Sequence, residues 1–228
     1  MNDFAVVSEG VTDQAVLHRI LLTYFKTPDF EPGVVFEQPR LDATGEAQWR
    51  GHGTWLNVFR YLEDKLYREA FQTSRYLVVQ IDSDCSEMEG YGVLQSVDGR
   101  SATVTELVEA VARRFCEIIG AADLADYEGR FIFAVCVCEM ECWLLPLWTS
   151  GEGAARTANC LFALNRALAR EGRPTINPDK KDVRRYREAA LGYKKRATLL
   201  EEGRKNESLR LFLDRCSACE VPSGVVGI

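Results

Sequence analysis

The chain has 228 residues, of which 46% are hydrophobic and 27% are charged, and its formal net charge is −6. This composition is typical of a folded protein with a sizeable core, and no apolar run approaches the roughly 20 residues of a membrane-spanning helix. The negative charge argues against a protein that coats nucleic acid non-specifically, and because the first ten residues lack a basic segment and a cleavage site, we expect a cytoplasmic protein.

The N-terminal third of the chain predicts two strands and two helices. Residues 4–9 are a short β-branched run bounded by Gly10, which is typical of a buried strand. Thr12 can then cap a helix with an apolar face. A second strand is predicted at 34–38, and a helix at 54–71 follows a glycine-containing loop.

The remaining elements continue this alternation. Residues 75–84 and 130–139 are continuous apolar runs that predict strands, and a helix is expected at about 103–119 between them. The sequence after Met140 is predominantly helical in pattern. Apolar strands separated by helices indicate a sheet covered on both faces, with mostly parallel strands.

We therefore expect an α/β fold with a central sheet of about four strands, flanked by helices, and a helical C-terminal part. The glycine-rich segment at 151–153 is the predicted junction. It would separate a domain of residues 1–150 from a helical extension of residues 151–228.

Eight cysteines are distributed along the chain. Cys216 and Cys219 have the C-x-x-C spacing of zinc sites, but the nearest second pair, Cys136 and Cys138, has C-x-C spacing, so a zinc site is not favoured. Apolar surroundings indicate that six cysteines are small buried residues with free thiols. These six are Cys85, Cys116, Cys136, Cys138, Cys142 and Cys160.

Charge is distributed unevenly along the chain. Residues 180–210 carry 11 lysines and arginines against five acidic residues, whereas residues 1–179 carry 16 against 27. An acidic body with one basic segment is expected of a metal-dependent enzyme that acts on a polyanion. A solvated helical hairpin has the same pattern, so both interpretations stay open.

Acidic residues follow three of the four predicted strands. Because the carboxyl ends of parallel strands meet at one edge of a sheet, these side chains are expected to lie together. Such a cluster repels itself unless cations are present, and Mg²⁺ or Mn²⁺ are the hard ions that prefer oxygen ligands. The candidate ligands are Glu9, Asp82, Asp84, Glu139 and Glu141, with Asp13 about one turn into the first helix.

Each acidic residue also has an ordinary structural explanation. Asp13 suits the first turn of a helix because of the macrodipole, and Glu139 and Glu141 suit a helix start for the same reason. Asp82 and Asp84 suit a loop after a strand. The joint occurrence of acidic residues at strand ends favours the functional interpretation.

Two short segments, VVSEG with Glu9 and IDSD with Asp82 and Asp84, resemble the Toprim domain shared by topoisomerases, primases and several nucleases. The longer SEGVTDQAVLHRIL resembles the start of the Toprim half of overcoming-lysogenization-defect (OLD) nucleases and of small Toprim-like phage-defence proteins. CEMECWLL matches their third acidic element. The resemblance covers about residues 4–145, and GYKKRATLLEEGRKNESLRLFLDR is similar, more loosely, to the C-terminal end of small Toprim-like families.

The resemblance implies a Toprim-like Rossmannoid domain and a Mg²⁺- or Mn²⁺-dependent catalytic site with one or two ions. Glu9 would be the general acid/base or a ligand, and Asp82 and Asp84 would bind metal. Lys194 or Lys195 would stabilise transition-state charge. The further ligands would be Asp13, Glu139 and Glu141.

The first hypothesis is therefore a nuclease that cleaves DNA or RNA as the effector of an anti-phage or toxin-like system. No P-loop or ATPase half is visible, so an ATPase sensor would be a separate chain. We expect no membrane partner and leave a homo-oligomer open. The basic residues expected to guide the phosphate backbone are Lys180, Lys181, Arg184, Arg185, Lys194 and Lys195.

Two other functions stay open. The first is a non-catalytic Toprim-like binding or regulatory module that acts through a partner ATPase. The second is a phosphotransferase or phosphatase on another Rossmann-like sheet, with Asp82 as the nucleophile. The second alternative would leave Glu9 without a role.

Overall fold

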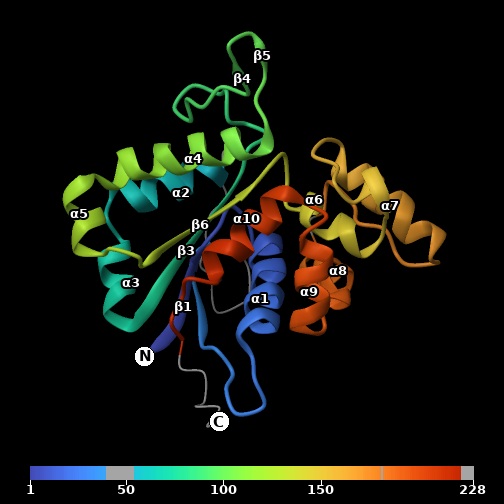
Figure 1. Ribbon diagram of the computed structural model, residues 1–228, viewed down its shortest axis with the longest axis horizontal. Helices are drawn as coiled ribbons and strands as arrows, with labels where there is room; N and C mark the ends of the chain where they lie inside the picture. Colours follow the sequence, from blue (N-terminus) through green and yellow to red (C-terminus); the bar gives the residue numbers. More distant parts are fainter. Residues whose placement is uncertain (40–53, 181, 222–228) are drawn as a thin grey trace. The chain divides into compact units, whose positions relative to one another are not determined.

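The computed structural model describes residues 1–39, 54–180 and 182–221 and contains a four-stranded parallel sheet (Figure 1). The strands are β1 (Asn2–Val7), β2 (Val34–Gln38), β3 (Ser74–Asp82) and β6 (Phe131–Cys136), in the order β2-β1-β3-β6. Every neighbouring pair is parallel. With helices flanking this sheet and a helical C-terminal part, the predicted α/β fold is confirmed.

The described chain divides into two compact units. Unit 1 comprises Met1–Val11 and Gly33–Val137, and unit 2 comprises Thr12–Pro32 together with the chain from Cys138 onward. Unit 1 holds the whole sheet, whereas unit 2 is helical. The predicted domain boundary near residue 150 stays a prediction.

Helices and a small hairpin complete unit 1. Helices α2, α3 and α4 pack against strands of the sheet because their buried faces are apolar. The hairpin lies between β3 and α4 in the sequence. The elements are α2 (Thr54–Glu63), α3 (Tyr67–Thr73), β4 (Ser96–Val97), β5 (Arg100–Ser101), α4 (Val104–Ile119) and α5 (Ala121–Asp126).

The single helix predicted over 54–71 is wrong, because the chain breaks between α2 and α3. Lys65 adopts a left-handed backbone with φ of 56° at the break. The break lets three side chains reach the buried Asp123 carboxylate: Lys65 Nζ at 2.8 Å, the Tyr67 hydroxyl at 2.7 Å and an Arg68 nitrogen at 2.6 Å. Periodicity alone does not show such a break, because apolar spacing continues across it.

Unit 2 is built around a buried tryptophan. Trp143 Nε1 donates to Ser208 Oγ at 2.8 Å, and its ring stacks on Phe212 with centroids 5.2 Å apart. In the described residues no helix combines the length and apolarity needed to cross a membrane. The elements are α1 (Val11–Phe25), α6 (Glu141–Leu144), η1 (Leu145–Leu147), η2 (Gly151–Gly153), α7 (Cys160–Arg170), α8 (Val183–Ala189), η3 (Ala190–Gly192), α9 (Arg196–Gly203) and α10 (Glu207–Cys216).

A disulfide corrects one cysteine interpretation. Cys142 and Cys160 were expected to be free thiols, but they form a disulfide that joins α6 to α7. Both are fully buried, so an apolar neighbourhood alone does not separate a bonded cysteine from a free one. The other six cysteines are free.

Candidate functional site

Glu9 and Asp82 lie at the carboxyl ends of two neighbouring strands, β1 and β3. The backbone N–H of Asp82 donates to Glu9 Oε1 at 2.6 Å, and the backbone N–H of Glu9 donates to Gln80 Oε1 at 3.1 Å. Glu9 is half-buried and Asp82 is buried. The parallel register of β1 and β3 therefore brings together two acids that are 73 residues apart in sequence.

A buried amide holds the Asp82 side chain in this arrangement. Gln80 is fully buried in β3, and its Nε2 donates to Asp82 Oδ1 at 2.8 Å. A buried amide is costly unless it is hydrogen-bonded, so Gln80 both needs and fixes the two acids. Gln80 is not among the predicted site residues. Its position as the single polar residue inside the apolar run LVVQI was the sequence feature that could have identified it.

A buried tyrosine lies within the electrostatic field of Glu9, Asp82 and Asp84. The Tyr91 hydroxyl donates to the Asp82 carbonyl oxygen at 3.1 Å. Burial and then the charges of Glu9, Asp82 and Asp84 raise the pKa of Tyr91 well above its ordinary value. Tyr91 therefore stays a neutral donor among three carboxylates.

The thiol of Cys85 experiences the same negative field. Burial, and after it the nearby charges of Asp84, Glu9 and Asp82, raise the pKa of Cys85 to about 11. Cys85 is therefore a thiol rather than a nucleophilic thiolate at neutral pH. These three carboxylates of unit 1 are called the first acidic set.

The expected strand geometry of Asp84 is wrong. β3 ends at Asp82, so Asp84 lies in the following turn and is exposed. Its position relative to Asp82 comes from the turn and not from the two-residue period of a strand. The tight turn is closed by Ser86, whose N–H donates to the Ser83 carbonyl at 3.1 Å.

Glu139 and Glu141 are likewise not on a continued strand. β6 ends at Cys136, Cys138 has a left-handed φ of 70°, and Met140 is helical as the N-cap of α6. Glu139 Oε1 instead accepts from the Leu161 N–H at 2.8 Å. Glu141 lies in the first turn of α6, where the helix macrodipole favours it.

The charges of Asp13, Glu139 and Glu141 nevertheless all act on another buried tyrosine, in unit 2. The buried Tyr186 hydroxyl donates to Glu141 Oε1. Burial and then the charges of Glu141, Asp13 and Glu139 raise the pKa of Tyr186. These three carboxylates are called the second acidic set.

The six predicted ligands thus fall into two sets of three, one in each unit. Their oxygens are the donor type that Mg²⁺ and Mn²⁺ prefer, and a carboxylate that accepts one hydrogen bond retains lone pairs for a cation. Within the described ranges, no three Asp, Glu, His or Cys side chains are already arranged as a cation site. The metal assignment stays a prediction that fits the donor chemistry.

The predicted basic residues lie in unit 2. Lys194 and Lys195 are exposed in the segment between η3 and α9. Lys180 and Arg184 are exposed, and Arg185 pairs with Glu188 at 2.8 Å. Lys181 lies outside the described residues. The nucleic-acid role of these residues stays a prediction.

The two cysteines with C-x-x-C spacing are both free thiols. Cys216 is buried and Cys219 is half-buried. Burial raises the pKa of Cys216 well above its ordinary value and that of Cys219 to about 11. Zinc binds thiolates, which a raised pKa disfavours.

Comparison with known proteins assigns no family, since no family model, no curated protein and no solved structure matches the chain. The Toprim resemblance therefore rests on the acidic segments around Glu9, Asp82 and Glu139.

Proposed function

We propose that the chain is a nuclease, a divalent-cation-dependent hydrolase of phosphodiester bonds in nucleic acid. The observation that carries the proposal is the first acidic set. At the carboxyl ends of β1 and β3, Glu9 Oε1 accepts from the Asp82 N–H at 2.6 Å, and Asp84 lies in the turn that follows. Open α/β sheets carry their functional groups at this edge.

The electrostatics of the first acidic set support a cation. Like charges held together disfavour ionisation unless an opposite charge is present. Gln80 and the backbone of Asp82 hold two of the carboxylates in place, so the set is positioned before any ligand arrives. Bound Mg²⁺ or Mn²⁺ would supply positive charge to stabilise the negative charge that develops on a phosphodiester.

The residues of the set would have different tasks. Asp84 is exposed and would meet an incoming cation or phosphate first. Asp82 is buried and orientated by Gln80, which suits a ligand of fixed position. Glu9 is half-buried between backbone and solvent, which suits a general base as well as a ligand. Lys194 remains the proposed group for transition-state charge.

The second acidic set extends the proposal. Asp13, Glu139 and Glu141 remain further candidate ligands on the sequence resemblance, and Glu141 is held by the buried Tyr186 hydroxyl. An anti-phage or toxin-like effector role, and a separate ATPase partner, are proposed on the sequence resemblance alone.

A cleavage assay tests the proposal. The full chain is incubated with single- and double-stranded DNA and RNA in Mg²⁺ or Mn²⁺, and then in EDTA. We expect cleavage only with the cation, and a loss of at least about 100-fold in Glu9→Gln and Asp82→Asn, because each removes a charge from the set. Circular dichroism checks that both variants are folded.

Matched controls make the result specific. Glu109→Gln and Asp64→Asn remove the same charges from exposed positions of unit 1, away from the set, and should cleave like the parent. Unchanged cleavage in Glu9→Gln and Asp82→Asn contradicts the proposal. If no cleavage occurs and calorimetry detects no cation binding at millimolar concentration, the non-catalytic binding module replaces it.

A further inference from the structure

Unit 2 contains a basic hollow that the acidic sets do not explain. Its volume is about 340 Å³, and leucine and threonine side chains line it together with five cationic side chains. Two of the cations come from α1 and its end, and three come from the consecutive residues before and at the start of α9. They are Arg19, Lys26, Lys194, Lys195 and Arg196.

Most of this positive charge has no counter-charge on the described chain. Lys26 pairs with Glu31, which is outside the lining, and Arg196 lies over the Tyr24 ring at 4.6 Å. Arg19, Lys194 and Lys195 have no carboxylate partner among the described residues, and no acidic side chain lines the hollow. Cations held this close repel one another, and a phosphate would relieve the repulsion.

The start of α9 adds to the positive electrostatic potential of the basic hollow. Lys195 is the N-cap of α9 but makes no side-chain capping bond, and Arg196 is the first helical residue. Basic residues at a helix N-terminus oppose the macrodipole and lower stability, whereas an anion there is favoured. The local sequence therefore favours anion binding over helix stability at this point.

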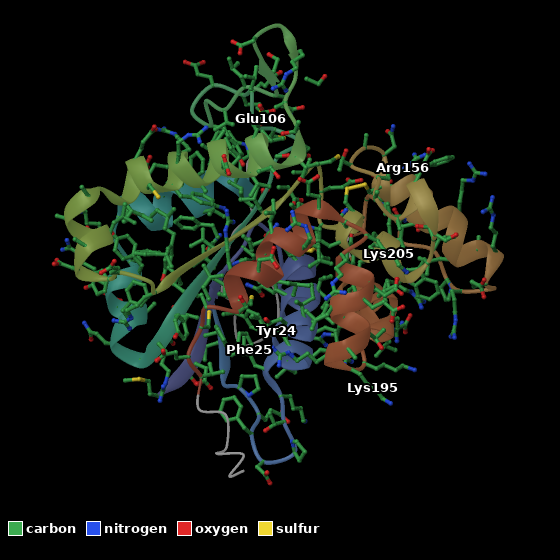
Figure 2. The ribbon with its side chains drawn as sticks, viewed as in Figure 1. Tyr24, Phe25, Glu106, Arg156, Lys195 and Lys205 are labelled. Carbon is green, nitrogen blue, oxygen red and sulfur yellow. A yellow bond between two sulfur atoms is a disulfide. The ribbon has the colours of Figure 1, made fainter. Side chains whose placement is uncertain are left out.

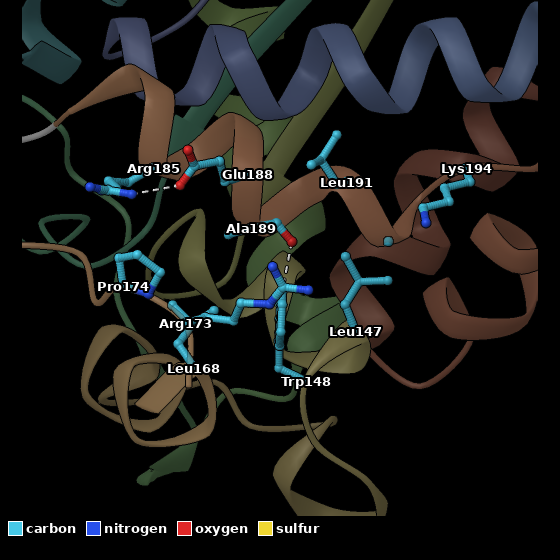
Figure 3. A pocket seen from close by; sticks show the side chains of 11 residues that line it. Leu147, Trp148, Leu168, Arg173, Pro174, Arg185, Glu188, Ala189, Leu191 and Lys194 are labelled. Atoms are coloured by element: carbon cyan, nitrogen blue, oxygen red, sulfur yellow. Dashed lines mark hydrogen bonds and ion pairs between the residues drawn. The ribbon is translucent and has the colours of Figure 1, made fainter. Parts of the chain in front are cut away.

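A second hollow of about 430 Å³, called the apolar hollow after most of its lining, shares Lys194 with the basic hollow. Arg185 and Glu188 also line it, and they pair with each other at 2.8 Å. Leu147, Trp148 and Leu168 line it on one side and Leu191 on another, with Arg173 reaching between them (Figure 3). Trp148 is half-buried, and its Nε1 donates to the Ala189 carbonyl at 2.9 Å, which fixes the indole. Leu191 is 46% exposed.

We propose that these two adjoining hollows bind single-stranded nucleic acid, with a backbone phosphate in the basic hollow and an unstacked base in the apolar hollow. Aromatic surfaces bind bases by stacking, and cationic grooves follow the phosphates. Bases of a duplex are paired and stacked, so they cannot enter a pocket without being extruded. This inference rests on the proposed nuclease function and names its substrate class.

The charge part of the inference is tested with two double variants. Lys194→Gln with Lys195→Gln removes two cations before α9, and Arg204→Gln with Lys205→Gln removes two cations after it. Figure 2 shows Lys195 and Lys205 at the two ends of this helix. The net charge changes equally, so the two variants differ in position and in the Lys205–Glu202 ion pair at 2.6 Å.

Binding of a labelled single-stranded oligonucleotide is measured by fluorescence anisotropy in EDTA at several salt concentrations. The first double variant should bind about tenfold more weakly and should lower the salt slope by about 0.7, as expected when one phosphate of a single strand is no longer neutralised. The second should bind like the parent. Equal losses in both variants overturn the inference, because they indicate a general charge effect.

The base part is tested by a carboxylate placed at the apolar hollow. Leu191→Glu adds a charge at its exposed rim, and Phe162→Glu adds the same charge at another exposed apolar position of unit 2 that is 64% exposed. The parent should bind the single strand at least about tenfold more tightly than the matched duplex, and only Leu191→Glu should reduce this preference. Equal or tighter binding of the duplex overturns the inference.

Failure of this inference can be separated from failure of the nuclease proposal. Binding is measured without cation in the Glu9→Gln background, so it does not require cleavage. If the parent binds the single strand as expected but shows no cation-dependent cleavage, the nuclease proposal is contradicted and the binding inference is not. Cleavage that needs Glu9 but gives unchanged binding in the Lys194 and Lys195 double variant contradicts the inference alone.

Discussion

At the residue scale, two buried tyrosines mark the candidate site more clearly than the carboxylates do. Tyr91 and Tyr186 are both almost fully buried, and each stands among three carboxylates that raise its pKa. A neutral phenol donates a hydrogen bond without adding charge, so it lowers the cost of keeping carboxylates partly buried. Tyr186 therefore holds the Glu141 carboxylate directly, whereas Tyr91 donates to the Asp82 backbone carbonyl and holds the turn that carries Asp84.

Removing the Tyr186 hydroxyl should destabilise the chain. Glu141 is only 4% exposed and accepts from this hydroxyl, so Tyr186→Phe leaves a buried carboxylate without its donor. We expect a loss of about 1–3 kcal/mol in the free energy of unfolding, measured by urea denaturation.

Tyr127, which lies outside both acidic sets, provides the control for that measurement. Tyr127 stacks on Phe71, and its hydroxyl makes no hydrogen bond within the described residues. Tyr127→Phe should therefore change stability by less than about 0.5 kcal/mol. An equal effect of the two substitutions would show that the hydroxyl of Tyr186 has no special role.

At the element scale, the strands and helices were largely predictable, whereas their ends were not. β2 was predicted at its observed bounds, 34–38, although it is a half-buried edge strand that ends in Glu37 and Gln38. The strands before Glu9, Asp84 and Glu139 end two to three residues earlier than expected, because turns and caps replace the ladder there. Such ends depend on tertiary contacts that periodicity does not report.

The candidate site was likewise predictable only where it depends on local sequence and not on tertiary contacts. Its carboxylates could be predicted because they follow apolar runs, and the fold brings Glu9 beside Asp82. Gln80 contacts Glu9 across 71 residues, and Tyr186 contacts Glu141 across 45. Partners this distant in sequence become visible only when the strand order and helix packing are known.

The disulfide between α6 and α7 should contribute to stability. Cys142 and Cys160 are separated by 18 residues, and closing a loop of this size restricts the unfolded chain by about 3 kcal/mol in the loop-entropy model. We expect a reducing agent to lower the free energy of unfolding by about this amount, as measured by urea denaturation.

The Cys160→Ser variant separates this bond from other effects of the reductant. It should unfold at lower urea concentration than the parent and should not respond further to reduction, because the six other cysteines are already free thiols. A parent protein whose denaturation midpoint does not change on reduction contradicts the disulfide.

At the scale of the whole molecule, the two units are interleaved along the chain. The polypeptide passes from one unit to the other after Val11, after Pro32 and after Val137. Helix α1 therefore belongs with the C-terminal helices although it lies between β1 and β2 in sequence. Asp13 follows the crossing after Val11, and Glu139 follows the crossing after Val137. The second acidic set therefore begins at Asp13, close in sequence to Glu9 of the first set.

A cut at residue 150 should therefore not yield a stable fragment. Ten of the 15 residues of α1 are buried, Thr23 Oγ1 donates to the Tyr193 carbonyl at 2.8 Å, and Arg196 covers the Tyr24 ring. A fragment of residues 1–150 keeps α1 but loses those partners, which exposes its apolar side chains. We expect it to bind a hydrophobic dye and to unfold at lower urea concentration than the full chain, and adding residues 151–228 in trans should reverse both effects. A fragment that unfolds at the same urea concentration as the full chain would establish 1–150 as an independent domain and would show that α1 does not need the C-terminal helices.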